Sequence, residues 1–392
     1  MVTNWKVTPL LLAMVFFVLY HWQVLEPSVK STFFELDTSF VSKAYFLFLL
    51  LIYVILYIIN SKPPVTCTVP NFSRSDAYGS ISLLFVCWAL ISIFIQGVSW
   101  GDFFVDRVGF VRSSNYPWAF GAIVPLSMVL ALRGLILFLY KKRPLALFIY
   151  LVPTIFIFLS GFRAVGVLTL VGIFLYYIIF FKQYRVFSFG TLIVIFVAYS
   201  AAILISYSRL LQMPSLEIES YDLYGKFSSA SSFLLTGELA QISQNFVIGF
   251  ENNLSCNGYS LAKSIVLQVP LLRDYYSGGD FGRYSICMNG YYGNLVSAKS
   301  GSNIFAEFFY VFGYIGPLIA VGIQVLIINV LIGMLKKSKS LLQHSAFTLL
   351  LSWTVFYYYR SDFSLTVGVV KLVIYLFLFA ALVNFMVRRK IE

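Results

Sequence analysis

Ten apolar stretches, separated by mostly short polar connectors, constrain the fold of this chain more than any motif does. A helix needs about 20 apolar residues to cross the roughly 30 Å hydrocarbon core of a bilayer. Only 11% of the residues are charged, whereas a soluble domain carries about 25%. The sequence therefore predicts an all-α, polytopic membrane protein with helices at residues 7–25, 41–60, 78–96, 117–140, 145–160, 164–181, 189–207, 304–334, 343–358 and 365–387.

The longest polar interruption, residues 209–303, divides the chain into three parts. Seven predicted membrane helices precede it in residues 1–208, and three follow it in residues 304–392. Apolar patches persist within this loop, for example at residues 262–272, and a disordered segment would lack them. We therefore expect short helices lying on the membrane surface, one of them ending before Pro270 because proline disfavours helix in the preceding residue.

Three local features refine this arrangement. Residues 304–334 are too long for one perpendicular span, and Gly313 and Gly316-Pro317 offer a place for a kink. The fifth and sixth apolar stretches are separated only by Ser160-Gly161-Phe162-Arg163, which predicts a tight hairpin. The connector at residues 26–42 is long enough to pack around the large loop.

Charge is distributed unevenly between the two sets of helix ends. The chain has 28 Lys and Arg against 16 Asp and Glu, and only Asp76 and Glu392 of these acids fall on the basic side. Cytoplasmic connectors carry an excess of Lys and Arg, so both termini are expected in the cytoplasm and the large loop outside. This bias explains the net charge of +12 without a nucleic-acid partner. No Gly-rich phosphate loop follows a cytoplasmic connector, which argues against nucleotide chemistry inside the cell.

The residues needed for metal or histidine chemistry are scarce. His21 and His344 are expected near opposite membrane faces, and no Cys or Asp cluster has the spacing of metal ligands. We therefore expect no metal and no cofactor. Cys256 and Cys287 share the outer loop, where two cysteines in an oxidising compartment favour a disulfide. The alternative is two unrelated small buried residues.

Arginines are the main candidates for binding on the outer face. A guanidinium group binds phosphate oxygens through two N–H groups and stays charged at any relevant pH. Several of them converging at one face would make a site for a lipid-linked diphosphate. Alternatively, each reaches lipid head groups or pairs with a neighbouring acid. The candidates are Arg163, Arg209, Arg273, Arg283 and Arg360.

Four polar side chains share one helical face at the start of the eighth predicted membrane helix: Asn303, Glu307, Tyr310 and Tyr314. A carboxylate there is expected to point into the bundle, away from lipid. Glu307 is therefore a candidate general base for a sugar hydroxyl, with Asp362 as the second candidate. Asn303 and Tyr310 are candidates to support that acceptor. Alternatively, Glu307 forms a salt bridge to an arginine and Asp362 is only an exposed loop acid.

This arrangement resembles the Wzy-type O-antigen polymerases of Gram-negative inner membranes, which polymerise oligosaccharide repeat units. That family also has many spans and one large periplasmic loop in the second half of the chain. Three local motifs carry the rest of the likeness: the start of the helix after the large loop, a turn containing arginine near the C-terminus, and a glycine and arginine hairpin. They are Gly301-Ser302-Asn303-Ile304-Phe305-Ala306-Glu307 with Phe312-Gly313-Tyr314-Ile315-Gly316, Arg360-Ser361-Asp362-Phe363, and Gly161-Phe162-Arg163.

The resemblance implies a GT-C-like glycosyltransferase of the bacterial inner membrane, active at the periplasmic face. It would transfer the growing glycan from undecaprenyl diphosphate to a sugar hydroxyl of the next lipid-linked unit. Arginines would stabilise the leaving diphosphate in place of a metal, and Glu307 or Asp362 would orient or deprotonate the acceptor. The implied partners are the lipid-linked oligosaccharide, the bilayer and a chain-length regulator protein.

Two alternatives stay open from the sequence. The related O-antigen ligases share the plan but use a histidine in the large loop, and residues 209–303 contain none. A secondary transporter or flippase of lipid-linked glycans would typically show internal repeats and a site at the membrane midplane. Here the ionisable residues gather at the outer face, which favours a polymerase.

Overall fold

The computed structural model describes residues 8–30, 35–60, 117–141, 144–159, 163–181, 240–251, 259–266, 284, 303–338, 340–363, 366–371, 373–375 and 377–378. Helix accounts for 91% of them, which confirms the all-α class. Their only strands form a small antiparallel ribbon, in which β1 (Ser28–Lys30) pairs with β2 (Glu35–Asp37). The chain divides into two compact units: Met1–Val65, Ser206–Val330 and Trp353–Gly368, and Thr66–Ile205, Leu331–Ser352 and Val369–Glu392.

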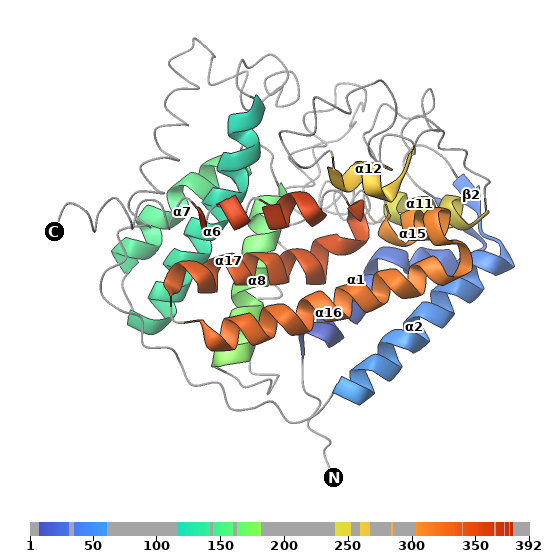
Figure 1. Ribbon diagram of the computed structural model, residues 1–392, viewed down its shortest axis with the longest axis horizontal. Coiled ribbons are helices and arrows are strands. Elements are labelled where there is room, and N and C mark those ends of the chain that lie inside the picture. Colours follow the sequence, from blue (N-terminus) through green and yellow to red (C-terminus); the bar gives the residue numbers. More distant parts are fainter. Residues whose placement is uncertain are drawn as a thin grey trace, which may run out of the picture. The chain divides into compact units, whose positions relative to one another are not determined.

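The helices follow the apolar stretches of the sequence (Figure 1). Of the predicted stretches, 78–96 and 189–207 lie outside the described residues, and 365–387 is described only in part. The helices and turns are α1 (Pro9–His21), η1 (Trp22–Leu25), α2 (Phe40–Asn60), α6 (Pro117–Lys141), α7 (Pro144–Leu159), α8 (Arg163–Phe180), α11 (Ala240–Glu251), α12 (Leu261–Val266), α15 (Ile304–Phe312), η3 (Gly313–Ile315), α16 (Gly316–Lys337), α17 (Leu341–Ser352), the π-helix η4 (Trp353–Tyr357) and η5 (Tyr358–Arg360).

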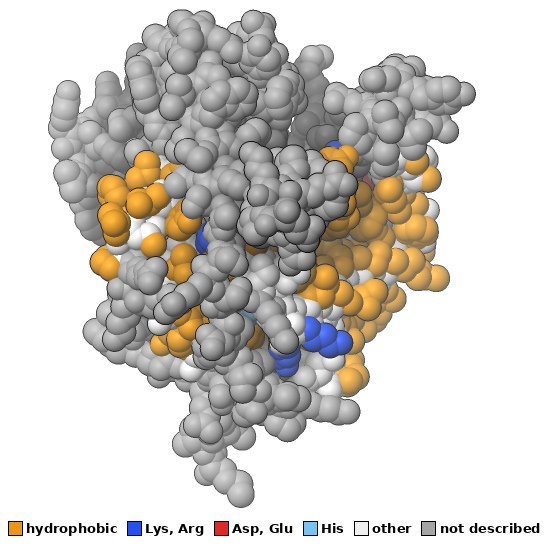
Figure 2. Space-filling model, turned by 60° about the vertical axis from the view of Figure 1, so that its left-hand side comes forward, with side chains coloured by type: hydrophobic (Ala, Val, Ile, Leu, Met, Phe, Trp, Pro, Cys, Tyr) orange, Lys and Arg blue, Asp and Glu red, His pale blue; other side chains and the backbone are white. Residues whose placement is uncertain are grey.

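Within the part of the chain that the structure describes, two helices are long and apolar enough to cross a membrane. They are α2, with 21 residues, and the stretch Ile304–Lys337, with 34. On α2, Leu51, Ile58 and Ile59 are 55%, 63% and 62% exposed, and Figure 2 shows hydrophobic side chains over much of the described surface on one face. Large exposed apolar areas of this kind mark contact with lipid or protein. The other described helices contribute apolar stretches of only 10–17 residues, so ten spans stay a prediction.

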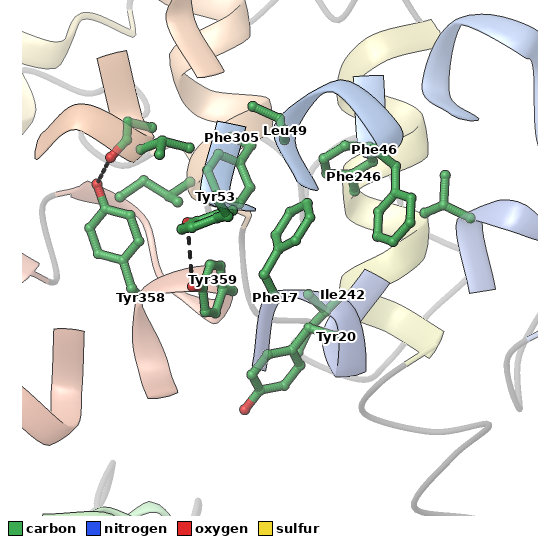
Figure 3. Packing of buried hydrophobic residues seen from close by; sticks show 14 of the residues in the cluster. Phe17, Tyr20, Phe46, Leu49, Tyr53, Ile242, Phe246, Phe305, Tyr358 and Tyr359 are labelled. Carbon is green, nitrogen blue, oxygen red and sulfur yellow. Dashed lines mark hydrogen bonds between the residues drawn. The ribbon is translucent and has the colours of Figure 1, made fainter. Parts of the chain in front are cut away.

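The first unit has an aromatic core to which α1, α2 and α15 contribute (Figure 3). Helix α1 begins where Thr8 Oγ1 accepts from Leu11 N at 3.2 Å, with Pro9 in the first turn, a combination that favours helix starts. Phe17 of α1 stacks on Phe46 of α2 and meets Phe305 of α15 edge to face, with ring centroids 5.3 and 5.5 Å apart. Aromatic pairs at such distances stabilise beyond the area they bury.

Part of the long loop packs inside this unit. In α11, residues 242–250 are all buried, so this helix packs against other parts of the protein, while a position of the loop's helices on the membrane surface stays a prediction. Ser243 Oγ donates to the Tyr20 carbonyl at 2.7 Å, and Gln244 Nε2 donates to the Val29 carbonyl at 3.0 Å. The second bond confirms that the 26–42 connector packs against the loop.

The predicted kink between α15 and α16 is confirmed. Helix α15 ends at Phe312, and Gly313 has φ +60°, a backbone conformation that favours glycine. A Cβ on Gly316 would overlap the backbone of Phe308, so the turn also needs glycine there. Helix α16 then starts in a new direction. Tyr314 is therefore 71% exposed and does not share a face with Glu307, which corrects the predicted polar stripe.

The second unit contains α6, α7, α8 and α17. The predicted hairpin is consistent with α7 ending at Leu159 and α8 starting at Arg163. His344 of α17 donates from Nε2 to the Ser338 carbonyl at 3.0 Å, so its Nδ1 accepts from the Tyr176 hydroxyl at 3.2 Å. Both ring nitrogens therefore serve the packing of this unit.

Candidate functional site

Glu307 lies in the first turn of α15 and is fully buried. The helix starts at Asn303, whose side-chain oxygen accepts from the backbone nitrogens of Phe305 and Ala306 at 3.0 and 3.3 Å. This side-chain cap satisfies donors that a helix leaves free at its first turn. A Cβ on Gly249 would overlap the Cβ of Ala306, so α11 and α15 cross at very close range. This close crossing helps to keep the first turn of α15 out of solvent.

Both oxygens of Glu307 accept hydrogen bonds from segments far away in the sequence. The Tyr259 hydroxyl donates to Oε1, and the Phe363 backbone nitrogen donates to Oε2 at 2.6 Å. Phe363 is the first helical residue after Asp362, so its N–H has no acceptor within its own helix. The carboxylate thus fixes both the large loop and the turn before the last described helix. These partners differ from the arginine that the salt-bridge alternative expected.

Asp362 and Arg360 belong to the same turn. Asp362 is fully buried, which rules out the alternative of an exposed loop acid. Arg360 is half-buried, and its guanidinium carbon lies 5.6 Å from the centroid of the Tyr357 ring. The structure therefore brings three of the predicted site residues, Glu307, Asp362 and Arg360, to one part of the first unit.

Three tyrosines cluster beside the carboxylate. Tyr310, predicted as a support for the acceptor, lies with its ring centroid 6.1 Å from Tyr259 and 5.9 Å from Tyr284. Burial raises the pKa of the Tyr259 phenol, and the negative charge of Glu307 raises it further. Tyr259 therefore remains a hydrogen-bond donor at ordinary pH. The sequence offered no signal that distinguishes Tyr259 and Tyr284 from the other tyrosines of the loop.

His21 is a further residue near the site whose role sequence reasoning missed. Its Nδ1 donates to the Phe17 carbonyl at 2.8 Å, and its Nε2 accepts from Asn303 Nδ2 at 2.8 Å. A carbonyl can only accept, so these contacts fix the neutral tautomer with hydrogen on Nδ1. With both nitrogens occupied, His21 orients the residue that caps α15 and is not free to act as a base.

The side chains of the remaining predicted arginines lie outside what the structure describes. Arg163 starts α8 in the second unit, and nothing describes its side chain. The predicted Arg209, Arg273 and Arg283, and the predicted disulfide between Cys256 and Cys287, lie outside the described residues. Their roles stay predictions.

The described residues include no group of three His, Cys, Asp or Glu side chains that could hold a metal ion. Independence from metal nevertheless stays a prediction, because much of the loop is outside this set. The chain matches no protein-family model, no curated protein and no solved structure. The chemistry of the site therefore has to be inferred from its geometry.

The geometry combines groups with complementary chemical abilities. A buried carboxylate can take a proton from a hydroxyl that displaces one of its donors. A guanidinium group in the adjoining turn can bind an anion such as a diphosphate. Aromatic rings beside the carboxylate offer flat apolar faces. A group transfer between an anionic leaving group and a hydroxyl acceptor fits this combination.

Proposed function

We propose that the protein is a membrane glycosyltransferase that polymerises lipid-linked oligosaccharide units. The donor is the growing glycan on undecaprenyl diphosphate, and the acceptor is a sugar hydroxyl of the next unit. The product is a surface polysaccharide such as O-antigen, as the Wzy-type resemblance implies. The observation that carries the proposal is the hydrogen bond from Phe363 to Glu307, which joins the candidate base to the turn holding Arg360 and Asp362.

In the reaction, the acceptor hydroxyl oxygen attacks the anomeric carbon of the donor sugar. The bond from that carbon to the diphosphate oxygen breaks, and the diphosphate leaves with the electron pair. The acceptor proton passes to Glu307, where the hydroxyl takes the place of Tyr259 on Oε1. Arg360 binds the departing diphosphate and stabilises its growing charge, and a role of Arg163 as a second cation stays a separate prediction. Asp362 is the second carboxylate that orients the acceptor.

The two apolar helices long enough to span a bilayer and the uneven charge distribution support a membrane location. We place the protein in the bacterial inner membrane, with ten helices, a GT-C-like arrangement and both termini in the cytoplasm. Glu307 and the 360–363 turn then face the periplasm. There they meet the lipid-linked unit and, where one is present, a chain-length regulator.

Purified protein in liposomes containing only lipid-linked units tests this proposal. We expect a ladder of longer glycans without nucleotide, ion gradient or divalent metal, and the ladder should survive excess chelator. Movement of units across the bilayer without lengthening would contradict the proposal and favour the flippase alternative. Transfer only to a different lipid acceptor would favour the ligase alternative. Glu26→Gln, at an exposed acid, serves as the control for protein handling.

A further inference from the structure

A second polar cluster lies in the core of the first unit. Its centre is Gln324 of α16, which is fully buried within a stretch long enough to span a membrane. A polar group in such surroundings is costly unless its hydrogen bonds are satisfied. An apolar side chain would fill the same space without that requirement. The amide therefore calls for a specific reason.

The hydrogen-bond partners of Gln324 determine the orientation of its amide. The Thr354 carbonyl can only accept, and it lies 2.7 Å from the atom that must be Nε2. The second hydrogen of Nε2 points to the Tyr359 oxygen at 3.0 Å, and Oε1 accepts from the Tyr53 hydroxyl. Tyr359 keeps its own hydrogen for the Ala13 carbonyl at 2.7 Å. Figure 3 shows Tyr53 and Tyr359 facing each other.

These contacts hold the segment where helix α17 changes its geometry. After Ser352 the chain continues as the π-helix η4 and then as the tighter 3-10 turn η5. Wide π-turns are rare and occur often at functional sites. Gln324 binds Thr354 within η4 and Tyr359 within η5, so one amide holds both parts. Tyr358 adds a bond from its hydroxyl to the Ala320 carbonyl of α16 at 2.8 Å.

The chain that leaves η5 leads directly to the candidate site. Arg360 ends η5, Asp362 follows, and Phe363 donates to Glu307. The stretch Ile304–Lys337 thus holds the 354–363 segment along its length, with the Ala320 carbonyl accepting from Tyr358 in the middle. Glu307 binds its far end, and Gln324 binds its beginning.

We propose that Gln324 is a positioning residue that sets the 360–363 turn in register with Glu307. Its amide holds η4 and η5 and thereby positions the turn that contains Arg360 and Asp362 and that donates from Phe363 N to Glu307. The catalytic part of this inference rests on the proposed glycosyl transfer, in which Arg360 binds the diphosphate. Misplacing a reacting group by about 1 Å can cost roughly a hundredfold in rate.

A structural measurement tests the positioning without relying on activity. Ser361 is fully buried in the turn, so Ser361→Cys provides a thiol that reacts slowly with a water-soluble maleimide. The chain has four cysteines of its own. The signal is therefore the labelling of the Ser361→Cys protein minus the labelling of the same protein without Ser361→Cys. Gln324→Met in that background should increase the labelling rate at least several-fold. Gln244→Met, which removes another buried amide of the same unit that bonds to a backbone carbonyl, should leave it unchanged. Equal labelling rates of Ser361→Cys with and without Gln324→Met would overturn the positioning role.

Kinetics then test the consequence for transfer. Gln324→Met should lower the maximal rate of glycan lengthening by roughly tenfold or more, with the amount of folded protein matched to Gln244→Met. Tyr359→Phe keeps the ring and removes only the hydroxyl, and it should add little further loss in the Gln324→Met background, because both act through one network. A full-rate Gln324→Met would overturn the catalytic part. A wild type without any lengthening would instead overturn the proposed function, while the labelling experiment would still decide the positioning.

Discussion

At the scale of single residues, Glu307 is held by two donors from distant segments, Tyr259 and Phe363. Both oxygens of this buried side chain therefore have a hydrogen-bond partner, as buried polar groups generally do. Arg360 is half-buried and lies over the Tyr357 ring, and in the proposed reaction its guanidinium group binds the diphosphate. In the proposed reaction, Glu307 acts on the acceptor hydroxyl and Arg360 acts on the donor diphosphate. The expected effect of each variant on glycan lengthening follows from these two roles.

Arg360→Ala should lower the rate of glycan lengthening by roughly a hundredfold, comparable to losing one donor of an oxyanion site. Arg360→Lys should recover only part of this loss, since lysine keeps the charge but not the planar pair of N–H groups. Lys43→Ala is the matched control, at a half-buried cation near the start of α2. The assay is initial lengthening rate at equal protein in liposomes. Full recovery by lysine would show that charge alone matters.

Tyr259 leads to a prediction about alkaline pH. Its pKa is raised in the folded protein from the ordinary value of 10.0. Below pH 10 both the folded and the unfolded state hold the phenol proton, so this residue adds no pH dependence. Above that pH the unfolded chain loses the proton first, and stability falls by about 1.4 kcal/mol per pH unit for each such proton. Tyr259→Phe should therefore make the loss of stability above pH 10 less steep, as measured by unfolding temperature in detergent. An unchanged slope would mean that Tyr259 is not buried against the carboxylate.

At the scale of elements, glycines decide how the helices around the site fit together. Gly313 and Gly316 let the chain break between α15 and α16, and Gly249 lets α11 approach α15 closely. The break could be predicted, because two glycines and a proline interrupt a stretch too long for one span. The crossing at Gly249 could not, since nothing local in a polar loop indicates which distant helix its glycine will meet.

Gly249→Ala should destabilise the first unit. The added methyl group would overlap Ala306, and overpacking of this kind costs about 1–3 kcal/mol. Gly322→Ala is the control, because a Cβ there meets nothing within 4 Å, and alanine favours helix over glycine. Unfolding temperature in detergent should fall for the first variant and stay or rise for the second. Equal temperatures would argue against the close crossing of α11 and α15.

The positions of the helices could be predicted from the sequence more completely than the contacts within the candidate site. Apolar stretches fix where a helix lies, and a buried acid in one of them singles out Glu307. Its partners could not be found in the same way, because Tyr259 is one of 27 tyrosines and His21 is 282 residues from Asn303. The burial of Asp362 also could not be predicted. A polar residue in a short connector is expected to be exposed when its packing is not known.

At the scale of the whole molecule, the account depends on which side of the membrane holds Glu307. The basic residues argue for cytoplasmic termini and an external loop. Reporter fusions ending after Gln244 and after Lys337 should report opposite compartments, the first periplasmic and the second cytoplasmic. The same compartment for both would refute the ten-helix orientation and remove the site from the face where lipid-linked units are proposed to bind.

The central claim is that Glu307 accepts the proton of the attacking sugar hydroxyl. The most direct measurement is glycan ladder length made by purified Glu307→Gln protein in liposomes, beside wild type and the Glu26→Gln control. Glutamine keeps an oxygen that can accept from Tyr259 or Phe363 but is not a base, so folding and donor binding should persist while lengthening stops. Lipid-linked donor retained on the variant with no ladder is the predicted result. A ladder of wild-type length and rate from Glu307→Gln would contradict the account and leave Glu307 as a structural residue.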